Sequence, residues 1–503
     1  MEVQTFDGFS EEEQSSKAGF LEGYITGDLI SMNYQNRIER LCDKNEKFCQ
    51  KLKEFLEENK RFIETMIKQY NDNDFWHQMS LIHKQIEGMQ SGYDLWKTHN
   101  KFNTKTEFFS NKEILLLNIA SEISTLKDIL IPERNDSHSG HCSAIVKPLP
   151  DGSDLFVAHN TWSDYDWMLR VMKKYSFHFK SLQHNKTKLI PGHTAAFPSY
   201  PGIILSSDDY YVLSSGLVVQ ETTIHNQNKT LTLSVKPNNC IPEFARNIIA
   251  NRLAESGNQW TQIFSQYNSG TYNNQFMIID YKLFKRGTKL SNLGNDLLWI
   301  VEQMPGLTRA KDVTYVLREE GYWASYNVPF IKQIYQISGN EELFRKSGSY
   351  YSWNSTARAR IFRREESKVT DLKSLYSLMR YNDFKVDPLS KCQEYNQTCS
   401  PPYSADLTIA ARNDLNDPKG RYPLYQWGHR GEGAIDAKLT NIDMVSKMEM
   451  IAVSGPTDKQ QPPFQWSKSD LTLSHVGQPD LFNFKPIHVK WFPSTYQTIY
   501  DFD

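Results

Sequence analysis

The apolar positions of the chain follow a helical repeat in its first quarter and change to short strand-like runs afterwards. Between about residues 28 and 130, apolar side chains recur at helical spacing, as in Ile38, Leu41, Phe48, Leu52, Phe55, Phe62, Ile63 and Ile67. Two further helical stretches are predicted at 75–96 and 113–131, and the second stops at Pro132. We expect the apolar faces of these helices to pack into a core.

From residue 142 onward the sequence predicts strands that alternate with helices. The apolar runs typical of strands cover 202–205, 210–219, 231–234, 275–281 and 297–303. Helices are expected at 241–255 and 371–381, and further strand or loop segments at 322–330 and 357–362. A helix-rich segment followed by mixed strands and helices predicts an α+β protein in which helices pack on antiparallel sheets.

A β-hairpin is predicted around the turn Asp151-Gly152, which joins apolar runs at 142–146 and 155–159. The Asp-Gly pair is typical of two-residue hairpin loops, because glycine adopts a positive φ at no steric cost. A loop of this length fixes which residues of the two strands face each other.

That register places Cys142 opposite Thr161, with His159 as its diagonal neighbour and Trp162 just beyond. Cys142 also follows directly on a polar loop, 132–140, which ends the helix-rich segment. A cysteine at the head of a strand, reached by a histidine and a tryptophan, is a candidate for chemistry. The alternative is a buried core thiol, which is the ordinary state of an unpaired cysteine.

Composition excludes some classes of protein. The chain has 503 residues and a net charge of -2, so no long-range field attracts nucleic acid or an anionic membrane, and no nucleic-acid partner is expected. No stretch approaches 18 uncharged apolar residues, so no transmembrane segment is expected. The first five residues, Met-Glu-Val-Gln-Thr, open a polar segment and do not resemble a signal peptide.

The six cysteines include two close pairs, Cys42 with Cys49 and Cys392 with Cys399. Seven residues along an unbroken helix would hold two Cα atoms about 10 Å apart, too far for a disulfide. The polar run 43–46 breaks the first helix, however, and the second pair brackets a polar loop, so both pairs could close small loops in an oxidising compartment. The alternative is six reduced thiols in the cytosol. Neither pair has the second half of a zinc site, so no metal is expected.

Acceptor sequons for N-glycosylation also bear on the compartment. The pattern N-x-[ST] occurs at Asn135, Asn185, Asn228, Asn354 and Asn396. Together with the paired cysteines, these sequons favour a secreted or lysosomal protein. Its targeting segment is then missing from this sequence, or unrecognisable in it.

Cys142 is the candidate nucleophile. A cysteine needs a lowered pKa or a nearby base to react at neutral pH. If the chain is cut just before Cys142, the freed α-amino group, with an ordinary pKa of about 7.7–8.0, can serve as that base. The polar loop before Cys142 is a place where such a new N-terminus could lie.

Other residues could complete such a site. Asn327, which precedes a Val-Pro pair, could donate to an oxyanion, or it could simply cap a turn. Arg358 belongs to a basic run that could be a solvated face, although in a strand alternate arginines would point inward. The segment 267–275, dense in amides and hydroxyls, is either a substrate-positioning loop or a turn-rich hairpin. We find no G-x-S-x-G elbow, P-loop or H-E-x-x-H motif, and no cofactor is expected.

Seven segments, in the same order along the chain, resemble the phospholipase B-like (lamina ancestor) family. They are HCSA at 141–144, TWSDY at 161–165, MLR at 168–170, the segment 267–280, VEQMPG at 301–306, GAIDAK at 433–438 and GQPDL at 477–481. The resemblance covers most of the chain except its first 25 residues or so.

The resemblance implies an α+β protein with the four-layer αββα sandwich of N-terminal-nucleophile hydrolases, related to bile-salt hydrolases and penicillin V acylases. It implies autocatalytic scission into a helix-rich chain, 1–141, and a core chain, 142–503, which stay together in a lysosomal or secreted glycoprotein. The implied site residues are the nucleophile Cys142, the pocket residues His159 and Trp162, the oxyanion-stabilising Thr223 and Asn327, and Arg358. The implied disulfides are Cys42–Cys49 and Cys392–Cys399, which leave Cys240 free.

Two hypotheses for function follow. In the first, the chain is an acyl hydrolase: the Cys142 thiolate attacks an ester or amide, and water releases the acid from an acyl-enzyme. The resemblance implies deacylation of glycerophospholipids, whereas amide hydrolysis is chemically at least as natural for such a site. In the second hypothesis, the chain is a catalytically silent lipid-binding or carrier glycoprotein on the same scaffold.

Overall fold

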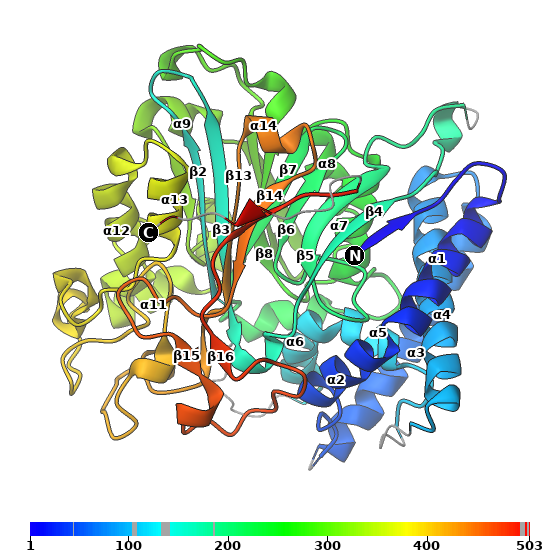
Figure 1. The fold of residues 1–503 in the computed structure, drawn as a ribbon, viewed down its shortest axis with the longest axis horizontal. Coiled ribbons are helices and arrows are strands. Elements are labelled where there is room, and N and C mark those ends of the chain that lie inside the picture. Colours follow the sequence, from blue (N-terminus) through cyan, green and yellow to red (C-terminus); the bar gives the residue numbers. More distant parts are fainter. Residues whose placement is uncertain are drawn as a thin grey trace.

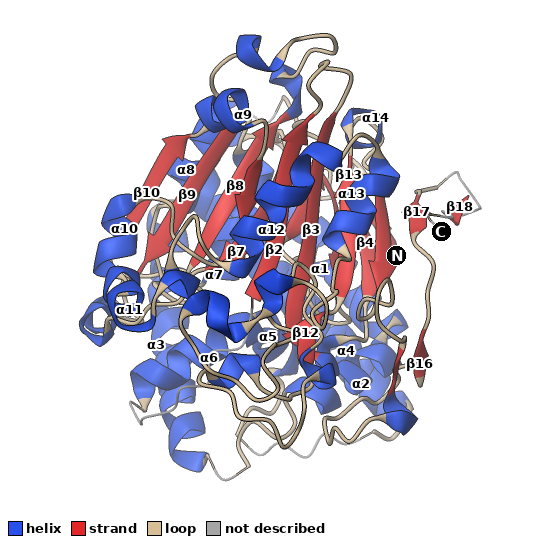
Figure 2. Ribbon diagram, turned by 90° about the vertical axis from the view of Figure 1, so that its left-hand side faces the viewer, coloured by secondary structure: helices blue, strands red, loops and turns tan. Residues whose placement is uncertain are grey.

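The computed structural model describes residues 1–43, 45–102, 108–131, 141–184, 187–492, 498, 499 and 502. Figure 1 shows four layers, in which two sheets face each other and helices cover the outer side of each sheet. In Figure 2 the helices α12 (Ala357–Glu365) and α13 (Leu372–Met379) lie in front of the strands that they cover. The predicted α+β sandwich of helices on antiparallel sheets is confirmed.

After β1, most of the described residues up to 131 form helices that cover the first sheet (Figure 1). The predicted helical region is confirmed, but the structure adds a helix before it, α1, which begins after the capping box of Ser10 and Glu13. The apolar pattern does not reveal this helix, because it buries mainly small and polar side chains. The helices are α1 (Glu11–Ile25), α2 (Gly27–Arg37), α3 (Glu46–Gln69), α4 (Asp74–His99), α5 (Glu113–Asn118) and α6 (Ala120–Leu130).

The first sheet is antiparallel apart from its edge strand β1, which pairs in parallel with β4. Its strands, in spatial order, are β1 (Glu2–Gln4), β4 (Val171–Ser176), β5 (Thr194–Ser199), β6 (Tyr210–Leu213), β7 (Leu217–Thr223), β8 (Asn274–Asp280), β9 (Leu298–Met304) and β10 (Leu307–Asp312).

The second sheet contains the predicted hairpin near its centre and is antiparallel in all its described pairings. Its strands, in spatial order, are β11 (Trp323–Ser325), β2 (His141–Pro148), β3 (Leu155–Asp164), β13 (Asp436–Thr440), β14 (Met450–Ser454), β17 (Ile487–Val489) and β18 (Thr498–Ile499), with β12 (Glu432–Ala434) also on β3. A separate small ladder joins β15 (Phe464–Gln465) and β16 (Leu481–Phe482).

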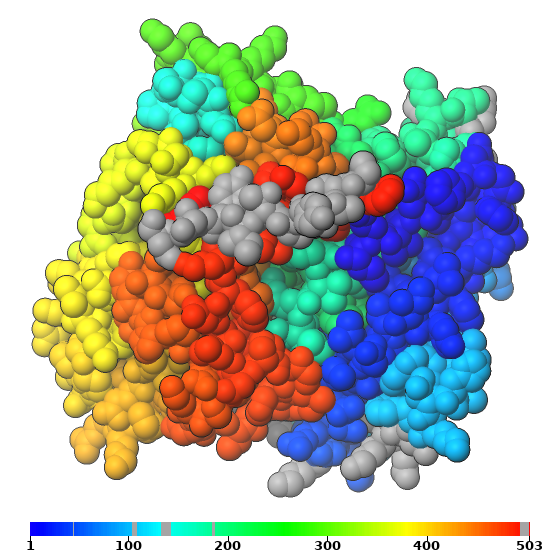
Figure 3. Space-filling view, viewed as in Figure 1, coloured from blue at the N-terminus to red at the C-terminus, as the bar shows by residue number. Residues whose placement is uncertain are grey.

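The remaining helices connect or cover these strands. They are α7 (Glu243–Leu253), α8 (Gly257–Phe264), α9 (Thr314–Glu320), α10 (Lys332–Ile337), α11 (Asn340–Ser347) and α14 (Ile442–Val445). In the space-filling view the dark blue N-terminal helices and the red and orange C-terminal segment lie on one face, with blue-green surface between them (Figure 3).

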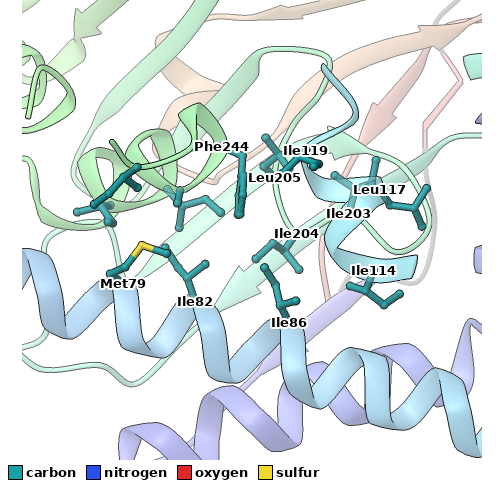
Figure 4. Close-up of a cluster of buried hydrophobic side chains, with 14 of the residues drawn as sticks. Met79, Ile82, Ile86, Ile114, Leu117, Ile119, Ile203, Ile204, Leu205 and Phe244 are labelled. Atoms are coloured by element: carbon teal, nitrogen blue, oxygen red, sulfur yellow. The ribbon is translucent and has the colours of Figure 1, made fainter. Parts of the chain in front are cut away.

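Three large apolar cores hold the four layers together, and one of them lies between the second sheet and helices α12 and α13. Between the sheets, Ala144, Val146 and Val157 pack in one cluster with Val218 and Met277 of the facing sheet. The second core lies between the first sheet and its helices, and Figure 4 shows part of it. The residues labelled there are Met79, Ile82, Ile86, Ile114, Leu117, Ile119, Ile203, Ile204, Leu205 and Phe244.

Two of the predicted strands are wrong, and so is one segment predicted as strand or loop. Residues 202–205 form a turn whose apolar side chains are buried against the helices, so burial and not strand pairing explains the apolar run. Residues 231–234 lie in a short 3-10 helix, Lys229–Ser234. Residues 357–362 belong to α12, which Thr356 begins by accepting a hydrogen bond from the backbone of Ala359.

Other predicted elements agree closely with the structure. The helices at 241–255 and 371–381 are α7 and α13, and the strands at 275–281 and 297–303 are β8 and β9. The run at 210–219 divides into β6 and β7, which are joined by a turn, and only the short β11 forms within 322–330. Boundaries shift by a residue or two, as hydrogen bonding at element ends commonly causes.

Both close cysteine pairs are disulfides. The Cα atoms are 5.8 Å apart in Cys42–Cys49 and 5.9 Å apart in Cys392–Cys399. The first pair is possible because the chain leaves the helical path between α2 and α3, as the polar run there indicates. Cys142 and Cys240 are the free cysteines of the described chain, and both are buried. No helix among the described residues is both long and apolar enough to cross a membrane.

Helices α1 and α4 cross at unusually short range because four glycines line the contact. A Cβ atom built on Gly19, Gly23, Gly88 or Gly92 would come within 2.1 Å of a backbone oxygen of the opposite helix. Spacing of four residues places each pair of glycines on one helix face. The absence of side chains therefore sets the distance between these two helices.

We predict that Gly88→Ala lowers the midpoint of thermal unfolding. In an exposed helix this substitution would stabilise by about 1 kcal/mol, but here the added methyl group meets Ser16 O and forces the helices apart, at a cost of about 1–3 kcal/mol. Gly294→Ala is the control, since a Cβ there meets no atom within 4 Å and φ is not positive. A Gly88→Ala protein as stable as the wild type would contradict the close crossing.

Candidate active site

The hairpin β2–β3 has the predicted register. Cys142 lies opposite Thr161, and Ala144 lies opposite His159. The connection is longer than the predicted two-residue loop. Leu149 N donates a hydrogen bond to Asp154 O, and the chain reverses direction between these two residues. The parity of the pairing is unchanged, so every side chain keeps its predicted face.

Both backbone polar groups of Cys142 are bound by side chains from other elements. The Cys142 N–H donates to Asn327 Oδ1 at 3.0 Å, and Arg358 Nη1 donates to the Cys142 carbonyl oxygen at 2.5 Å. Asn327 follows β11, and Arg358 lies on α12. Cys142 is itself only 2% exposed. Segments distant in sequence thus fix the first residue that follows the predicted scission point.

The amide of Asn327 has only one orientation that satisfies both neighbours. A backbone N–H faces one side of the amide and a carbonyl faces the other, so Oδ1 must accept from Cys142 and Nδ2 must donate to Thr223 O, at 2.8 Å. Asn327 has a φ of 71°, a left-handed conformation that asparagine tolerates better than most residues. Thr223 therefore orients Asn327 through its backbone, and oxyanion donation by either residue stays a prediction.

The helix α12 separates two arginines that a strand would place together. Consecutive helical residues are about 100° apart, so Arg358 and Arg360 point to nearly opposite sides. Arg358 is buried, with its guanidinium carbon 4.4 Å from the centre of the Trp162 ring. Arg360 instead pairs with Glu394 at 2.9 Å near the surface. The expectation that alternate arginines of an extended segment point inward does not apply, because the segment is a helix.

His159 and Trp162 lie on opposite faces of the second sheet. His159 points between the sheets, where Nε2 is 2.7 Å from Glu221 O and Nδ1 has no hydrogen-bond partner among the described residues. Burial lowers the pKa of His159 well below its ordinary value, so the ring is neutral and donates from Nε2. Trp162 points to the helix side, where Nε1 donates to Asn160 Oδ1 at 3.0 Å.

A pair of buried carboxyl groups faces the same space as Cys142. Tyr272 donates its hydroxyl to Asp209 Oδ2 at 2.7 Å and lies 2.9 Å from Glu221 Oε1. Burial, with the charge of Asp209 beside it, raises the pKa of Glu221 well above its usual range, and burial raises the pKa of Asp209 to about 6. The pair therefore keeps one proton at neutral pH and gains a second as the pH falls below about 6.

Burial, with Asp209 next in importance, raises the pKa of the Cys142 thiol in this uncut chain. A hydrogen bond from the Trp162 backbone and the charge of Lys438 act in the opposite direction but do not outweigh it. The thiol is therefore protonated at neutral pH in this state. Reaction needs a proton acceptor close to the sulfur.

A network of charged groups connects the nucleophile candidate with the first sheet. Lys438 Nζ donates to Thr161 Oγ1 at 2.5 Å and to Asp436 Oδ2 at 2.7 Å. Arg170 pairs with Asp436 and with Asp208. These attractions lower the pKa of Asp436 to about 2 despite its burial. The cations and carboxylates compensate one another in a region that excludes water.

Sequence reasoning assigned no role to these network residues. Arg170, Asp436 and Lys438 fall within the quoted family-like segments, so a signal was present, but no local spacing indicates that they meet. Asp209 and Glu221 lie in ordinary strand and turn sequence and gave no signal. Tyr272 belongs to the segment 267–275 and does reach the site.

Two cavities border this region. One, of 290 Å³, is lined by Asn327 and Arg358 together with aromatic residues such as Tyr326 and Tyr350. The other, of 350 Å³, has mostly apolar lining, and Arg170, Asp436 and Lys438 form its polar end. Its apolar residues include Met168, Leu169, Val171, Met172, Pro198, Phe482, Phe484 and Ile487.

The predicted glycosylation sites differ in their surroundings. Asn354 and Asn396 are exposed, and Asn228 is half-buried, with its amide donating to Ile337 O at 3.0 Å. Asn135 and Asn185 lie outside the described residues, as does the predicted polar loop at 132–140. Over the described ranges, no group of three or more His, Cys, Asp or Glu side chains could hold a metal ion.

Comparison with known proteins gives one consistent result. Residues 1–489 match the profile of the family described as Phospholipase B. The phospholipase B-like 2 proteins of Bos taurus and Homo sapiens are both 41% identical to the chain, over 500 and 499 residues, which are 98% of this chain and 83% of each relative. The phospholipase B-like 1 protein of Caenorhabditis elegans is 39% identical over 489 residues, 95% of this chain and 82% of the relative.

The shared proton of Asp209 and Glu221 leads to a prediction about pH and stability. Asp209 has a raised pKa in the folded chain, so its contribution to stability is complete below the unfolded value near 4 and is lost as pH rises through about 6. The neutral, buried His159 has the opposite effect on how stability changes with pH. The pH dependence of the wild type alone therefore does not reveal the contribution of Asp209 and Glu221. Asp209→Asn keeps the shape and removes the ionisation.

Between pH 5 and pH 7.5, we expect the wild type to lose more stability than Asp209→Asn, by roughly 1–3 kcal/mol. Denaturant unfolding at both pH values measures this difference. Asp72→Asn, at an exposed position, is the control and should follow the wild type. Equal loss in wild type and Asp209→Asn would show that the pair carries no extra proton.

Proposed function

Because the chain belongs to the phospholipase B family, we propose that it is an acyl hydrolase whose nucleophile is Cys142. Its substrates would be esters or amides of lipid-like molecules, with glycerophospholipids as the first candidates. One observation carries the proposal: Asn327 and Arg358 bind the backbone N–H and C=O of this one cysteine. A core thiol does not need such a pair of hydrogen bonds, whereas a residue that must keep its position after the chain is cut would benefit from them.

In this proposal the chain first cuts itself before Cys142. The thiol sulfur attacks the carbonyl carbon of residue 141, and the peptide nitrogen leaves as the α-amino group of Cys142. Water then hydrolyses the thioester, so that residue 141 gains a carboxylate and the thiol is restored. The new α-amino group replaces the N–H that Asn327 Oδ1 now binds, and it can accept the thiol proton in each later turnover.

Substrate turnover would follow the same chemistry. The thiolate attacks an acyl carbonyl, the alcohol or amine leaves with a proton from the α-ammonium group, and water hydrolyses the acyl-enzyme. Arg358 would hold the Cys142 carbonyl and so the angle of the sulfur. The 350 Å³ cavity is suited to an acyl chain, since its lining is mostly apolar and its polar end contacts the network at Thr161, opposite Cys142.

Contacts between the two predicted chains support their staying together after scission. Glu22 of α1 accepts hydrogen bonds from Lys173 and Tyr175 of β4, each at 2.6 Å, and all three side chains are buried. Asn59 of α3 donates to Pro237 O and to Cys240 O. The second core, which includes α4 and β7, is shared in the same way. Scission would remove a covalent link without removing these contacts.

A lysosomal or secreted location belongs to the same proposal. The two disulfides, and exposed sequons at Asn354 and Asn396, are typical of proteins that pass through an oxidising compartment.

A second candidate function is a silent lipid-binding glycoprotein, which the buried, protonated Cys142 of the uncut chain favours. A thiol-reactive acyl probe separates the two, because only the hydrolase labels at Cys142 and loses turnover.

We predict that Cys142→Ala remains a single chain and has no hydrolase activity. The wild type should give two bands on a denaturing gel after reduction, and N-terminal sequencing of the larger one should begin at Cys142. Cys240→Ala is the matched control, as the other buried free cysteine, and should be cut like the wild type. Normal scission of Cys142→Ala would refute self-processing by this residue.

Arg358→Lys should lower turnover without unfolding the protein, whereas Arg360→Lys should do much less. Lysine keeps the charge but loses the fork that reaches Cys142 O while stacking on Trp162. The expected loss is roughly ten- to a hundredfold, equivalent to a charge-assisted hydrogen bond of about 1.5–3 kcal/mol. Release of fatty acid from a glycerophospholipid measures it. Equal losses in both variants would remove Arg358 from the site.

A further inference from the structure

Arg37, the last residue of α2, is half-buried as a whole, but its guanidinium nitrogens are buried and make no hydrogen bond with the described residues. Its guanidinium carbon lies 2.9 Å from the centre of the Trp167 ring and 5.2 Å from that of Tyr200. All three of its side-chain nitrogens are buried, and none has a hydrogen-bond partner within the part of the chain that the structure describes. A buried guanidinium with five unused N–H groups is costly, so a structural role alone does not explain it.

The carboxyl groups nearby do not neutralise Arg37. Burial, reinforced by the neighbouring Asp164, raises the pKa of Asp166 to about 8, so Asp166 is largely uncharged at neutral and acidic pH. Burial lowers the pKa of Arg37 only to about 10, so the arginine keeps its charge. Asp208, the next carboxylate, already pairs with Arg170. The guanidinium of Arg37 thus keeps a fixed position and a positive charge, while its N–H groups make no hydrogen bonds with the described residues.

Arg37 is also connected to the candidate active site. Tyr200, which lies against the guanidinium, donates its hydroxyl to Asp208 Oδ1 at 2.5 Å. The backbone oxygen of Asp208 accepts from Thr161 Oγ1 at 3.1 Å, and Thr161 lies opposite Cys142 in the ladder. Arg37 belongs to the segment before the proposed scission point, and these partners belong to the segment after it.

We propose that Arg37 binds an anionic group, a phosphate or a carboxylate, of the molecule that enters the site. The planar fork of arginine suits two oxygens of either group, and the rings of Trp167 and Tyr200 hold it in one orientation. The N-terminal segment then supplies a recognition residue and not only a cover for the sheet. This assignment of substrate class rests on the proposed function, but anion binding itself does not.

The test measures anion binding by the full-length wild-type protein, without turnover. Inorganic phosphate and hexanoate are titrated separately at constant ionic strength, and the shift of the thermal midpoint gives each dissociation constant. Saturable binding of phosphate alone assigns a phosphate-bearing ligand, and binding of hexanoate alone assigns a carboxylate. If neither ion binds saturably, the proposal is overturned.

Arg37→Met then locates the binding. We expect at least a tenfold weaker response to the anion and, without the anion, a thermal midpoint at or above that of the wild type, because an unpaired buried charge is removed. Arg40→Met, a nearby exposed arginine, should change neither result. Undiminished anion binding by Arg37→Met overturns the proposal. Turnover does not enter these measurements, so failure of Cys142 as nucleophile would be recognised separately.

Discussion

The pair of hydrogen bonds on the backbone of Cys142 is the constraint on which the candidate site depends. It joins the head of β2 to the segment after β11 through Asn327 and to α12 through Arg358. Each partner is fixed in turn, Asn327 by Thr223 O and Arg358 by the face of Trp162. Because strand, loop and helix layer all meet at one residue, displacement of any of them would move the sulfur. The four-layer packing is therefore what gives this cysteine a defined position.

The space between the two sheets has an apolar part and a polar part. Valine, alanine and methionine side chains fill the first, whereas Cys142 and Thr161 face charged groups such as Asp209, Lys438 and Asp436 in the second. Burying these charges is costly, and the cost is offset by dense pairing, by tyrosine hydroxyls and by protons retained on carboxyl groups. Such a region adds little to stability but provides fixed dipoles and exchangeable protons beside Cys142. The raised pKa values of Asp209 and Glu221 keep this pair of carboxyl groups protonated under acidic conditions.

The helix-rich segment is as much a part of this arrangement as the sheets are. Glu22 binds Lys173 and Tyr175 within the first sheet, and Arg37 reaches the aromatic side chains beside the charged network. The glycine crossing of α1 and α4 allows these helices to lie close together. If the chain is cut before Cys142, as we propose, these contacts would hold the two parts together. Scission would then change the chemistry at residue 142, by creating an amine, more than it changes the fold.

Local patterns determined much of this protein. Helical periodicity located α2 to α6, strand-like runs located most of the central strands, and the Asp-Gly turn predicted the register that pairs Cys142 with Thr161. Patterns failed where burial was not periodic, as in the glycine-lined α1, and where an apolar or basic run had two possible conformations. Arg358 and Arg360 illustrate the limit: only the helical turn of α12 sends the first to Cys142 and the second to Glu394. The shared proton of Asp209 and Glu221 and the unpaired charge of Arg37 likewise exist only in the folded chain, because burial and neighbours from distant segments create them.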